Sequence, residues 1–212
     1  MLEFKNIKVS DLKESVISAR NAYRIEQPVY TDEEFEKSLE RAKKLVIASA
    51  TSKNVKCHDN FLTGINVSFD MKYTQYITKQ FQRYHWFDYV SSSSLMHSIT
   101  KMDFDECCNK YVSDKTKEYM KELIAKYNNI VNSKEEYTDI DVYNFHLYEA
   151  YMEIISNCPM GCELFVRVRT NYKQLQTIYH QRLHHKLKED WGAFCDMVKS
   201  LPYAKEFITG EE

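Results

Sequence analysis

The sequence predicts an α/β fold built as a single domain. Two segments, 64–70 and 163–169, alternate apolar and polar residues as half-buried strands do. Helical periodicity follows each of them, and two more helical segments lie between them. The chain has no internal repeat and no linker rich in proline or glycine. With 212 residues, 43% of them hydrophobic, it is long enough to bury a substantial core.

The first predicted element is a helix over 32–49. Thr31 precedes three acidic residues, 32–34, which is typical of a capped helix start. Apolar residues then recur at helical spacing: Phe35, Leu39, Ala42, Leu45 and Val46.

The next predicted elements are the strand at 64–70 and a helix over about 73–84. Residues 88–97 are expected to form a loop. Four consecutive serines, 91–94, offer hydroxyl groups that compete with regular backbone pairing.

The second half of the chain is predicted to be mainly helical. Helices are expected at 113–133 and 137–156, joined through 133–136. Residues 158–161, Cys-Pro-Met-Gly, break the chain before the strand at 163–169. The last two predicted helices span about 171–186 and 190–200.

Composition restricts the class of protein. The net charge of −2 gives no overall basic field for nucleic acid, and no apolar run approaches the roughly 20 residues that span a bilayer. The six cysteines form no disulfide framework and the start of the chain carries no apolar signal segment, so we expect a soluble, reduced, cytoplasmic protein. Only four glycines occur, which excludes a G-x-G-x-x-G fingerprint and a Walker loop.

The junction at 167–182 carries the densest set of polar side chains. A strand with alternate arginines, Arg167 and Arg169, leads directly into a helix. Three residues of that helix, Asn171, Gln174 and Arg182, recur at helical spacing and can share a face. This pattern suits an anionic, hydrogen-bonding small molecule. The alternative is a surface helix whose cations pair with acids elsewhere in the chain.

A second candidate segment, 82–94, mixes cationic, aromatic and hydroxyl groups. Such a mixture can stack a flat ring and bind phosphate. The alternative is the edge of an aromatic core followed by a serine loop.

Metal binding is not predicted. His180 and His184 have the i, i+4 spacing of a metal pair, but no acid completes that face and Lys186 and Lys188 would repel a cation. The cysteine pairs 107/108 and 158/162 lack the spacing of a zinc ribbon, so they are interpreted as buried free thiols.

Short blocks over most of the chain share the spacing of one known family. They include Ser18-Ala-Arg-Asn21, His58-Asp-Asn-Phe61, Pro159 before the second strand, the set Asn171, Lys173, Leu175 and Arg182, and then Trp191. Arg83, Tyr84 and His85 align with the family's Arg-His-Arg and Ser93 with its later serine, with one inserted residue. The chain thus resembles the flavin-dependent thymidylate synthases, and more closely a divergent subgroup typical of phage genomes.

The resemblance implies a central, mainly antiparallel sheet flanked by helices. It also implies one domain over 1–212, with a helical insertion at about 105–156. The site would lie between subunits of a homotetramer. FAD would be the cofactor, and NADPH and methylenetetrahydrofolate the co-substrates, for one-carbon transfer to C5 of dUMP or a related pyrimidine deoxynucleotide.

The resemblance also implies roles for individual residues. The implied catalytic residues are Arg83, His85 and Arg182. The implied cofactor-binding residues are His58, Arg83, Asn171 and Lys173. The implied substrate-binding residues are Arg20, Ser91, Ser92, Ser93, Gln174 and Arg182.

Two alternatives to catalysis stay open from the sequence. One is a nucleotide-binding or protein-interaction module that keeps the fold but has lost the reaction, which the altered signature motivates. The other is a nucleic-acid binder that uses Arg167, Arg169, Lys173 and Arg182. The near-neutral net charge disfavours this last reading.

Overall fold

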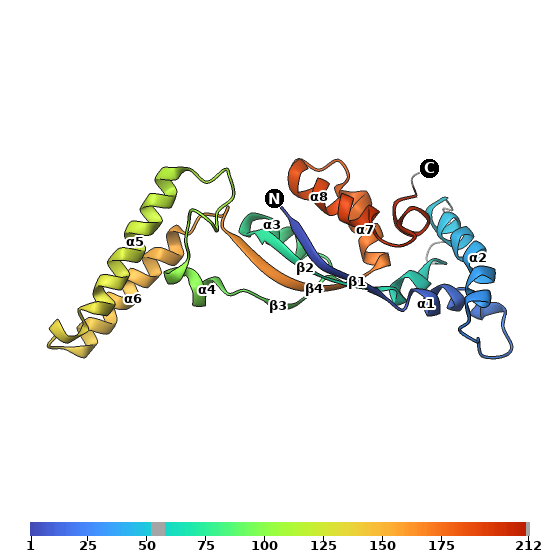
Figure 1. The fold of residues 1–212 in the computed structure, drawn as a ribbon, viewed down its shortest axis with the longest axis horizontal. Coiled ribbons are helices and arrows are strands. Elements are labelled where there is room, and N and C mark those ends of the chain that lie inside the picture. Colours follow the sequence, from blue (N-terminus) through green and yellow to red (C-terminus); the bar gives the residue numbers. More distant parts are fainter. Residues whose placement is uncertain (52–57, 211–212) are drawn as a thin grey trace. The chain divides into compact units, whose positions relative to one another are not determined.

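The computed structural model describes residues 1–51 and 58–210. The chain divides into two compact units, which are built from the elements labelled in Figure 1. The first unit contains Met1–Met71, Gln80–Ser91 and Arg167–Glu212, and the second contains Lys72–Lys79 and Ser92–Val166. The insertion predicted at about 105–156 falls within the second unit, and a single domain over 1–212 stays a prediction.

Four strands form one sheet in the order β1-β2-β4-β3. Their bounds are Glu3–Ser10 for β1, Asn66–Thr74 for β2, Asp88–Ser92 for β3 and Glu163–Asn171 for β4. Neighbouring strands run antiparallel, as side-chain pairs between β1 and β2 illustrate. The Asn6 amide donates to Asp70 (2.5 Å), while Asn66 donates to Asp11, just past the other end of β1 (2.9 Å). The predicted α/β (α+β) fold with an antiparallel sheet is therefore confirmed.

The helices of the first unit come from the N-terminal and the C-terminal parts of the chain. They are α1 (Leu12–Ser18), η1 (Asn21–Tyr23), α2 (Asp32–Thr51), η2 (Asn60–Gly64), α7 (Tyr172–Arg182), α8 (Lys188–Lys199) and the π-helical turn η5 (Lys205–Thr209). The predicted cap of α2 is confirmed, because the backbone N–H of Glu34 donates to the Thr31 hydroxyl at 3.2 Å.

The core of the first unit is aromatic. Phe194 of α8 packs edge-on against Phe4 of β1, which in turn meets Phe69 of β2. Phe81 stacks on Phe87 and contacts Trp191 with ring centroids 4.8 Å apart. Helix α8 thus covers one face of the sheet with apolar side chains, which supplies the main hydrophobic stabilisation of this unit.

A helical hairpin dominates the second unit. It consists of α5 (Asp114–Asn132), the short turn η4 (Lys134–Glu136) and α6 (Ile140–Asn157), and Figure 1 shows the two long helices side by side. Shorter helices precede it: α3 (Gln75–Phe81), whose last two residues belong to the first unit, α4 (Leu95–Ser98) and η3 (Ile99–Lys101). The hairpin packs on a small cluster that includes Phe104, Met120 and Ile154.

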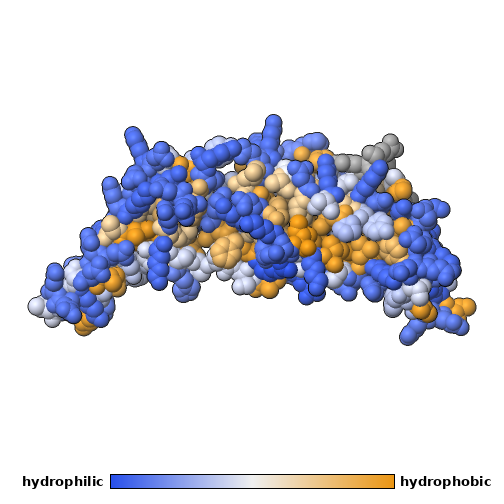
Figure 2. Space-filling view, in the orientation of Figure 1, coloured by the Kyte–Doolittle hydropathy of each residue, from blue (hydrophilic) through white to orange (hydrophobic). Residues whose placement is uncertain are grey.

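Hydrophobic side chains also reach the surface of this hairpin. Figure 2 shows them among hydrophilic residues near the end of the two helices. On α6, Val142, Phe145 and Tyr148 are exposed at a spacing of three residues, so they lie along one side of the helix. None of the helices in 1–51 and 58–210 is long and apolar enough to cross a membrane.

Two predicted boundaries are wrong. Strand β2 continues past residue 70 to Thr74, because Met71 and Tyr73 extend the buried alternation, and α3 is correspondingly shorter than predicted. The loop predicted at 88–97 contains β3 at 88–92 and the first three residues of α4. Ser93 explains the error, since its backbone N–H donates to the carbonyl of Phe165 and continues the pairing with β4.

Strand β1 and helix α1 were not expected from the sequence. The alternation in β1 is interrupted at Asn6, whose φ of 51° is left-handed, so Phe4 and Ile7 fall out of a period of two. Most of β1 is exposed and carries charged residues, as is usual for an edge strand. Both features remove the signal by which a half-buried strand is recognised.

Candidate functional site

The strand-to-helix junction of the first unit is held by Asn171. Its side-chain oxygen accepts a hydrogen bond from the backbone N–H of Gln174 at 2.9 Å and so caps α7. The residue is buried, and the preceding Thr170 donates its hydroxyl to the carbonyl of Trp86 at 2.7 Å. Asn171 therefore has a structural role in the first turn of α7, whatever it binds.

We expect Asn171→Ala to lower the free energy of unfolding by about 1 kcal/mol, the usual effect of losing an N-cap. Asn171→Ser keeps a capping oxygen and should cost only a few tenths of that energy. Urea unfolding followed by circular dichroism measures both. An equal loss in the two variants would contradict the capping role.

Lys173 forms an ion pair with a buried carboxylate. Its Nζ lies 2.5 Å from Oδ2 of Asp59, whose side chain is only 2% exposed, and 3.0 Å from Oε1 of Gln176. Oδ1 of Asp59 is buried without a hydrogen-bond partner among the residues that the structure describes. Lys173 therefore fits the alternative stated for this helix, in which its cations pair with acids elsewhere in the chain. The same holds for Arg167, which pairs with Asp70 at 2.9 Å.

Gln174 and Arg182 both face the segment 84–86, as predicted for these two residues, whereas Asn171, predicted on the same face, is the N-cap residue before α7. Oε1 of Gln174 accepts the backbone N–H of Trp86 at 3.3 Å. Nε of Arg182 donates to the hydroxyl of Tyr84 at 2.7 Å, and this hydroxyl donates to Gln181 at 3.1 Å. Within the first unit, residues 84–86 of the second predicted segment therefore contact the predicted junction at 167–182.

The guanidinium of Arg182 lies against two aromatic rings. Its central carbon is 4.7 Å from the centroid of Trp191 and 5.5 Å from that of Tyr84. Nε1 of Trp191 donates to Oε1 of Gln80 at 3.2 Å, which orients the indole ring. Cation–π contacts of this kind hold an arginine in place while its outer N–H groups point elsewhere. Arg182 is thus held in a position from which it can donate hydrogen bonds to an anion or a carbonyl group.

His185 borders the same arginine as a neutral imidazole. Burial lowers its pKa, and the nearby charges of Arg182 and Lys186 lower it further. Nδ1 of His185 accepts the backbone N–H of Leu187 at 3.1 Å, which requires an unprotonated nitrogen there. Arg182 is therefore the permanent positive charge of this group at neutral pH.

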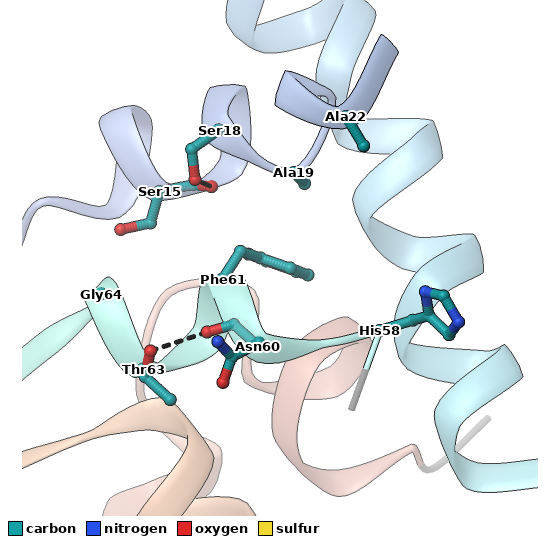
Figure 3. A pocket seen from close by; sticks show the side chains of 9 residues that line it. All are labelled: Ser15, Ser18, Ala19, Ala22, His58, Asn60, Phe61, Thr63 and Gly64. Carbon is teal, nitrogen blue, oxygen red and sulfur yellow. Dashed lines mark hydrogen bonds between the residues drawn. The ribbon is translucent and has the colours of Figure 1, made fainter. Parts of the chain in front are cut away.

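An open pocket of about 380 Å³ lies beside α1 in the first unit (Figure 3). Its lining residues come from α1, from the turn that follows it and from η2: Ser15, Ser18, Ala19, Ala22, His58, Asn60, Phe61, Thr63 and Gly64. Figure 3 shows Phe61 across from the small side chains of α1, with His58 at one end. None of these lining residues is an acid, a lysine or an arginine. The pocket offers one aromatic ring, one imidazole and several hydroxyl or amide groups.

Arg20 directly follows Ala19, one of the residues that line this pocket, and it is paired with Glu34. Its Nη1 lies 3.0 Å from Oε1 of Glu34, which also binds Arg24. The hydrogen bond from Arg24 lowers the pKa of Glu34, and the charge of Arg20 lowers it further. The charge of Arg20 is therefore neutralised in part by an acid on α2.

The remaining predicted residues lie on exposed segments. Arg83 and His85 are exposed, and the ring of His85 packs edge-on against Trp86 at 4.6 Å. Ser91 belongs to the first unit, while Ser92 and Ser93 belong to the second. In that unit the hydroxyl of Ser93 is hydrogen bonded to the backbone of Phe165 at 3.0 and 3.2 Å.

Two residues of this arrangement were not singled out for these roles, Asp59 and Tyr84. Both stand inside motifs quoted from the sequence, beside His58 and Arg83. No sequence signal links Asp59 to Lys173 or Tyr84 to Arg182, because the partners are 114 and 98 positions apart. Within the described residues, no group of three or more histidines, cysteines or acids is arranged to hold a metal ion.

The fold has solved counterparts. The structure is similar to a flavin-dependent thymidylate synthase, ThyX, of Helicobacter pylori in complex with FAD and dUMP. The TM-score is 0.60 with 12% identity, over 97% of both chains. A second structure of the enzyme from that organism with FAD and dUMP gives a TM-score of 0.58 with 13% identity, over 98% of this chain and 97% of the other. This chain has the ThyX fold. No protein-family model and no curated protein sequence matches it.

Proposed function

We propose that this protein is a flavin-dependent enzyme that transfers a one-carbon unit to C5 of dUMP or a related pyrimidine deoxynucleotide. The observation that carries the proposal is the shared fold over 97% of both chains with an enzyme solved with FAD and dUMP. The short blocks by which the sequence resembles the family support it independently. The phage-type subgroup remains part of this proposal.

The residues of the first unit fit such ligands. The pocket beside α1 has the size of a small-molecule site and is lined by Phe61 and His58, which can lie against a flat ring system. Bound FAD would supply the hydride chemistry. We assign His58, Lys173 and Asn171 to its binding, with Asn171 also capping α7. Arg83 is assigned to the flavin as well.

Arg182 is the residue we assign to the nucleotide. Its planar fork carries five N–H donors, of which the contact with Tyr84 uses one. Such a group binds a phosphate or a uracil carbonyl and stabilises negative charge that develops there. Gln174 and Arg20 are assigned to the same ligand, with Ser91, Ser92 and Ser93 for its phosphate. Arg83 and His85 complete the proposed catalytic set.

NADPH and methylenetetrahydrofolate are the proposed co-substrates, and a homotetramer the proposed assembly. The exposed apolar side of α6, with Phe145 at its centre, supports self-association. Light scattering should then give a mass near four times the 25.3 kDa of one chain. A monomeric mass at micromolar concentration would reject the tetramer.

Binding of FAD and dUMP tests the proposal directly. We expect the purified protein to be yellow or to bind added FAD with a Kd of about 1 μM or lower, and dUMP to perturb the flavin spectrum. Rescue of growth in a thymidine-requiring host would then establish the reaction. A colourless protein that binds neither FAD nor dUMP would reject the proposal.

A second candidate function is a nucleotide-binding or interaction protein that has lost the reaction. The departure of Arg83, Tyr84 and His85 from the Arg-His-Arg signature favours it. Retained dUMP binding without rescue would support this candidate, whereas rescue would exclude it.

A further inference from the structure

Four of the six cysteines come together in the second unit, although they lie in two distant parts of the sequence. Cys107 and Cys108 precede α5, while Cys158 and Cys162 lie between α6 and β4. Cys108 and Cys162 face each other as an antiparallel pair. These four thiols take no part in the function proposed above.

Backbone hydrogen bonds hold the two cysteine segments together. The N–H of Asn109 donates to the carbonyl of Gly161 at 3.0 Å, and that of Glu163 donates to the carbonyl of Cys107 at 2.7 Å. Gly161 permits this close approach, because a Cβ there would lie 2.5 Å from Cγ2 of Val112. Opposed residues in such a ladder have Cα atoms about 4.5–5.5 Å apart. In this pairing the residue opposite Cys162 is Cys108, and Cys107 is its chain neighbour, so the ladder brings Cys107 close to Cys162 without opposing it.

The thiols of Cys107 and Cys162 are in direct contact. Sγ of Cys162 donates to Sγ of Cys107 at 3.9 Å. A disulfide has an S–S distance of about 2.05 Å, so closure requires side-chain rotation while the paired backbone stays in place. The hydrogen-bonded segments 107–109 and 161–163 therefore keep these two sulfurs in contact in the reduced protein.

The two thiols differ in exposure in the way that a two-step oxidation requires. Cys107 is half-buried, whereas Cys162 is 0% exposed. The hydrogen bond from Cys162 lowers the pKa of Cys107, which favours its thiolate. Burial raises the pKa of Cys108 to about 12, and hydrogen bonds to Cys107 and Cys158 raise the pKa of Cys162, so neither thiol competes with Cys107 as the first nucleophile. Cys107 is thus an accessible nucleophile, as is Cys158, whose pKa is also lowered by Cys162, and Cys162 is the buried partner.

We propose that Cys107 and Cys162 form a reversible disulfide by exchange with a low-molecular-weight disulfide such as oxidised glutathione. The Cys107 thiolate attacks one sulfur of the small disulfide, its S–S bond breaks, and one small thiol leaves. Cys162 then loses its proton and attacks Sγ of Cys107, which breaks the mixed disulfide and releases the second small thiol. Two protein thiols are oxidised and one small disulfide is reduced to two thiols.

The bond would connect the chain on either side of the helical hairpin. Residues 107 and 162 flank α5 and α6, so the disulfide closes the segment that contains both helices. A cross-link between the ends of this segment restricts its unfolded state. Oxidation should therefore raise the thermal unfolding temperature of the second unit, and reduction should reverse the shift.

Peptide mapping of the oxidised protein tests the proposal. The reduced protein is incubated with oxidised glutathione, free thiols are alkylated, and the unreduced protein is digested with trypsin. We expect peptide 102–110 to be joined to peptide 135–167, with Cys195 alkylated. Fragment ions should assign the bond in the wild-type protein to Cys107 and Cys162, without reliance on any variant.

Two matched double variants separate this pair from its neighbours. The C108S/C158S variant keeps Cys107 and Cys162 and should cross-link at least about tenfold faster than C107S/C162S, which keeps the other two. Circular dichroism confirms that both variants fold. Equal rates in the two variants, glutathione adducts without a cross-link, or zinc bound stoichiometrically by the thiols would each overturn the proposal.

Discussion

Replacing Arg182 by alanine should weaken dUMP binding about 30-fold or more, because truncating one partner of a charge-paired contact costs roughly 2–5 kcal/mol. The guanidinium is positioned between Trp191 and the Tyr84 hydroxyl, so its contribution depends on a fixed fork. Arg182→Lys keeps the charge but loses the planar donors, and it should restore only part of the affinity. Titration of the FAD-loaded protein with dUMP, followed by flavin absorbance, gives these constants.

Arg41 is a matched control for this substitution. It makes the same kind of contacts with a tyrosine, donating to the hydroxyl of Tyr23 at 2.7 Å with its guanidinium carbon 5.0 Å from the ring centroid. Arg41→Ala therefore removes an equivalent arginine–tyrosine contact away from Arg182, and dUMP affinity should stay at the wild-type value. If Arg182→Ala and Arg41→Ala bind dUMP equally well, Arg182 is not a nucleotide ligand.

The elements predicted correctly are those with a buried face. Helix α2 and the core of β2 show clear periodicity because Phe35, Leu39, Val67 and Phe69 contact the interior. Strands β1 and β3 lie at the two edges of the sheet and are largely exposed, so they carry little alternation. Four serines at 91–94 made 88–97 resemble a loop, although pairing with β4 stabilises a strand at 88–92. An edge strand depends on its neighbour more than on its own sequence.

The candidate site was predictable only in its local part. The spacing of Gln174 and Arg182 placed them on one face of a helix, and the structure brings both to the segment 84–86. The partner of Lys173 was not predictable, because Asp59 is distant in sequence and a buried carboxylate has no sequence signature of its own. The same limit applied to Cys107 and Cys162, whose pairing depends on backbone hydrogen bonds between distant segments.

Two roles are therefore open for Lys173: a cofactor ligand and the ion-pair partner of Asp59. The resemblance assigns it to the flavin. The structure pairs it with the buried carboxylate of Asp59, whose second oxygen has no hydrogen-bond partner among the described residues. A buried charge that loses its partner is strongly destabilising, whereas a cofactor ligand can be lost without effect on the free protein. Stability measured without FAD, together with FAD affinity, therefore separates the two roles.

We expect Lys173→Met to lower the free energy of unfolding of the FAD-free protein by about 3 kcal/mol, since it leaves the Asp59 carboxylate buried and unpaired. Adding Asp59→Asn should recover much of this loss, because the neutral amide removes the unpaired charge. Urea unfolding of the four proteins in the double-mutant cycle gives the coupling energy. Lys13→Met is the control: its partner Asp32 is 98% exposed, so the cost should stay below about 1 kcal/mol. A coupling energy near zero would show that the pair does not stabilise the fold, and weaker FAD binding in Lys173→Met alone would then assign Lys173 to the cofactor.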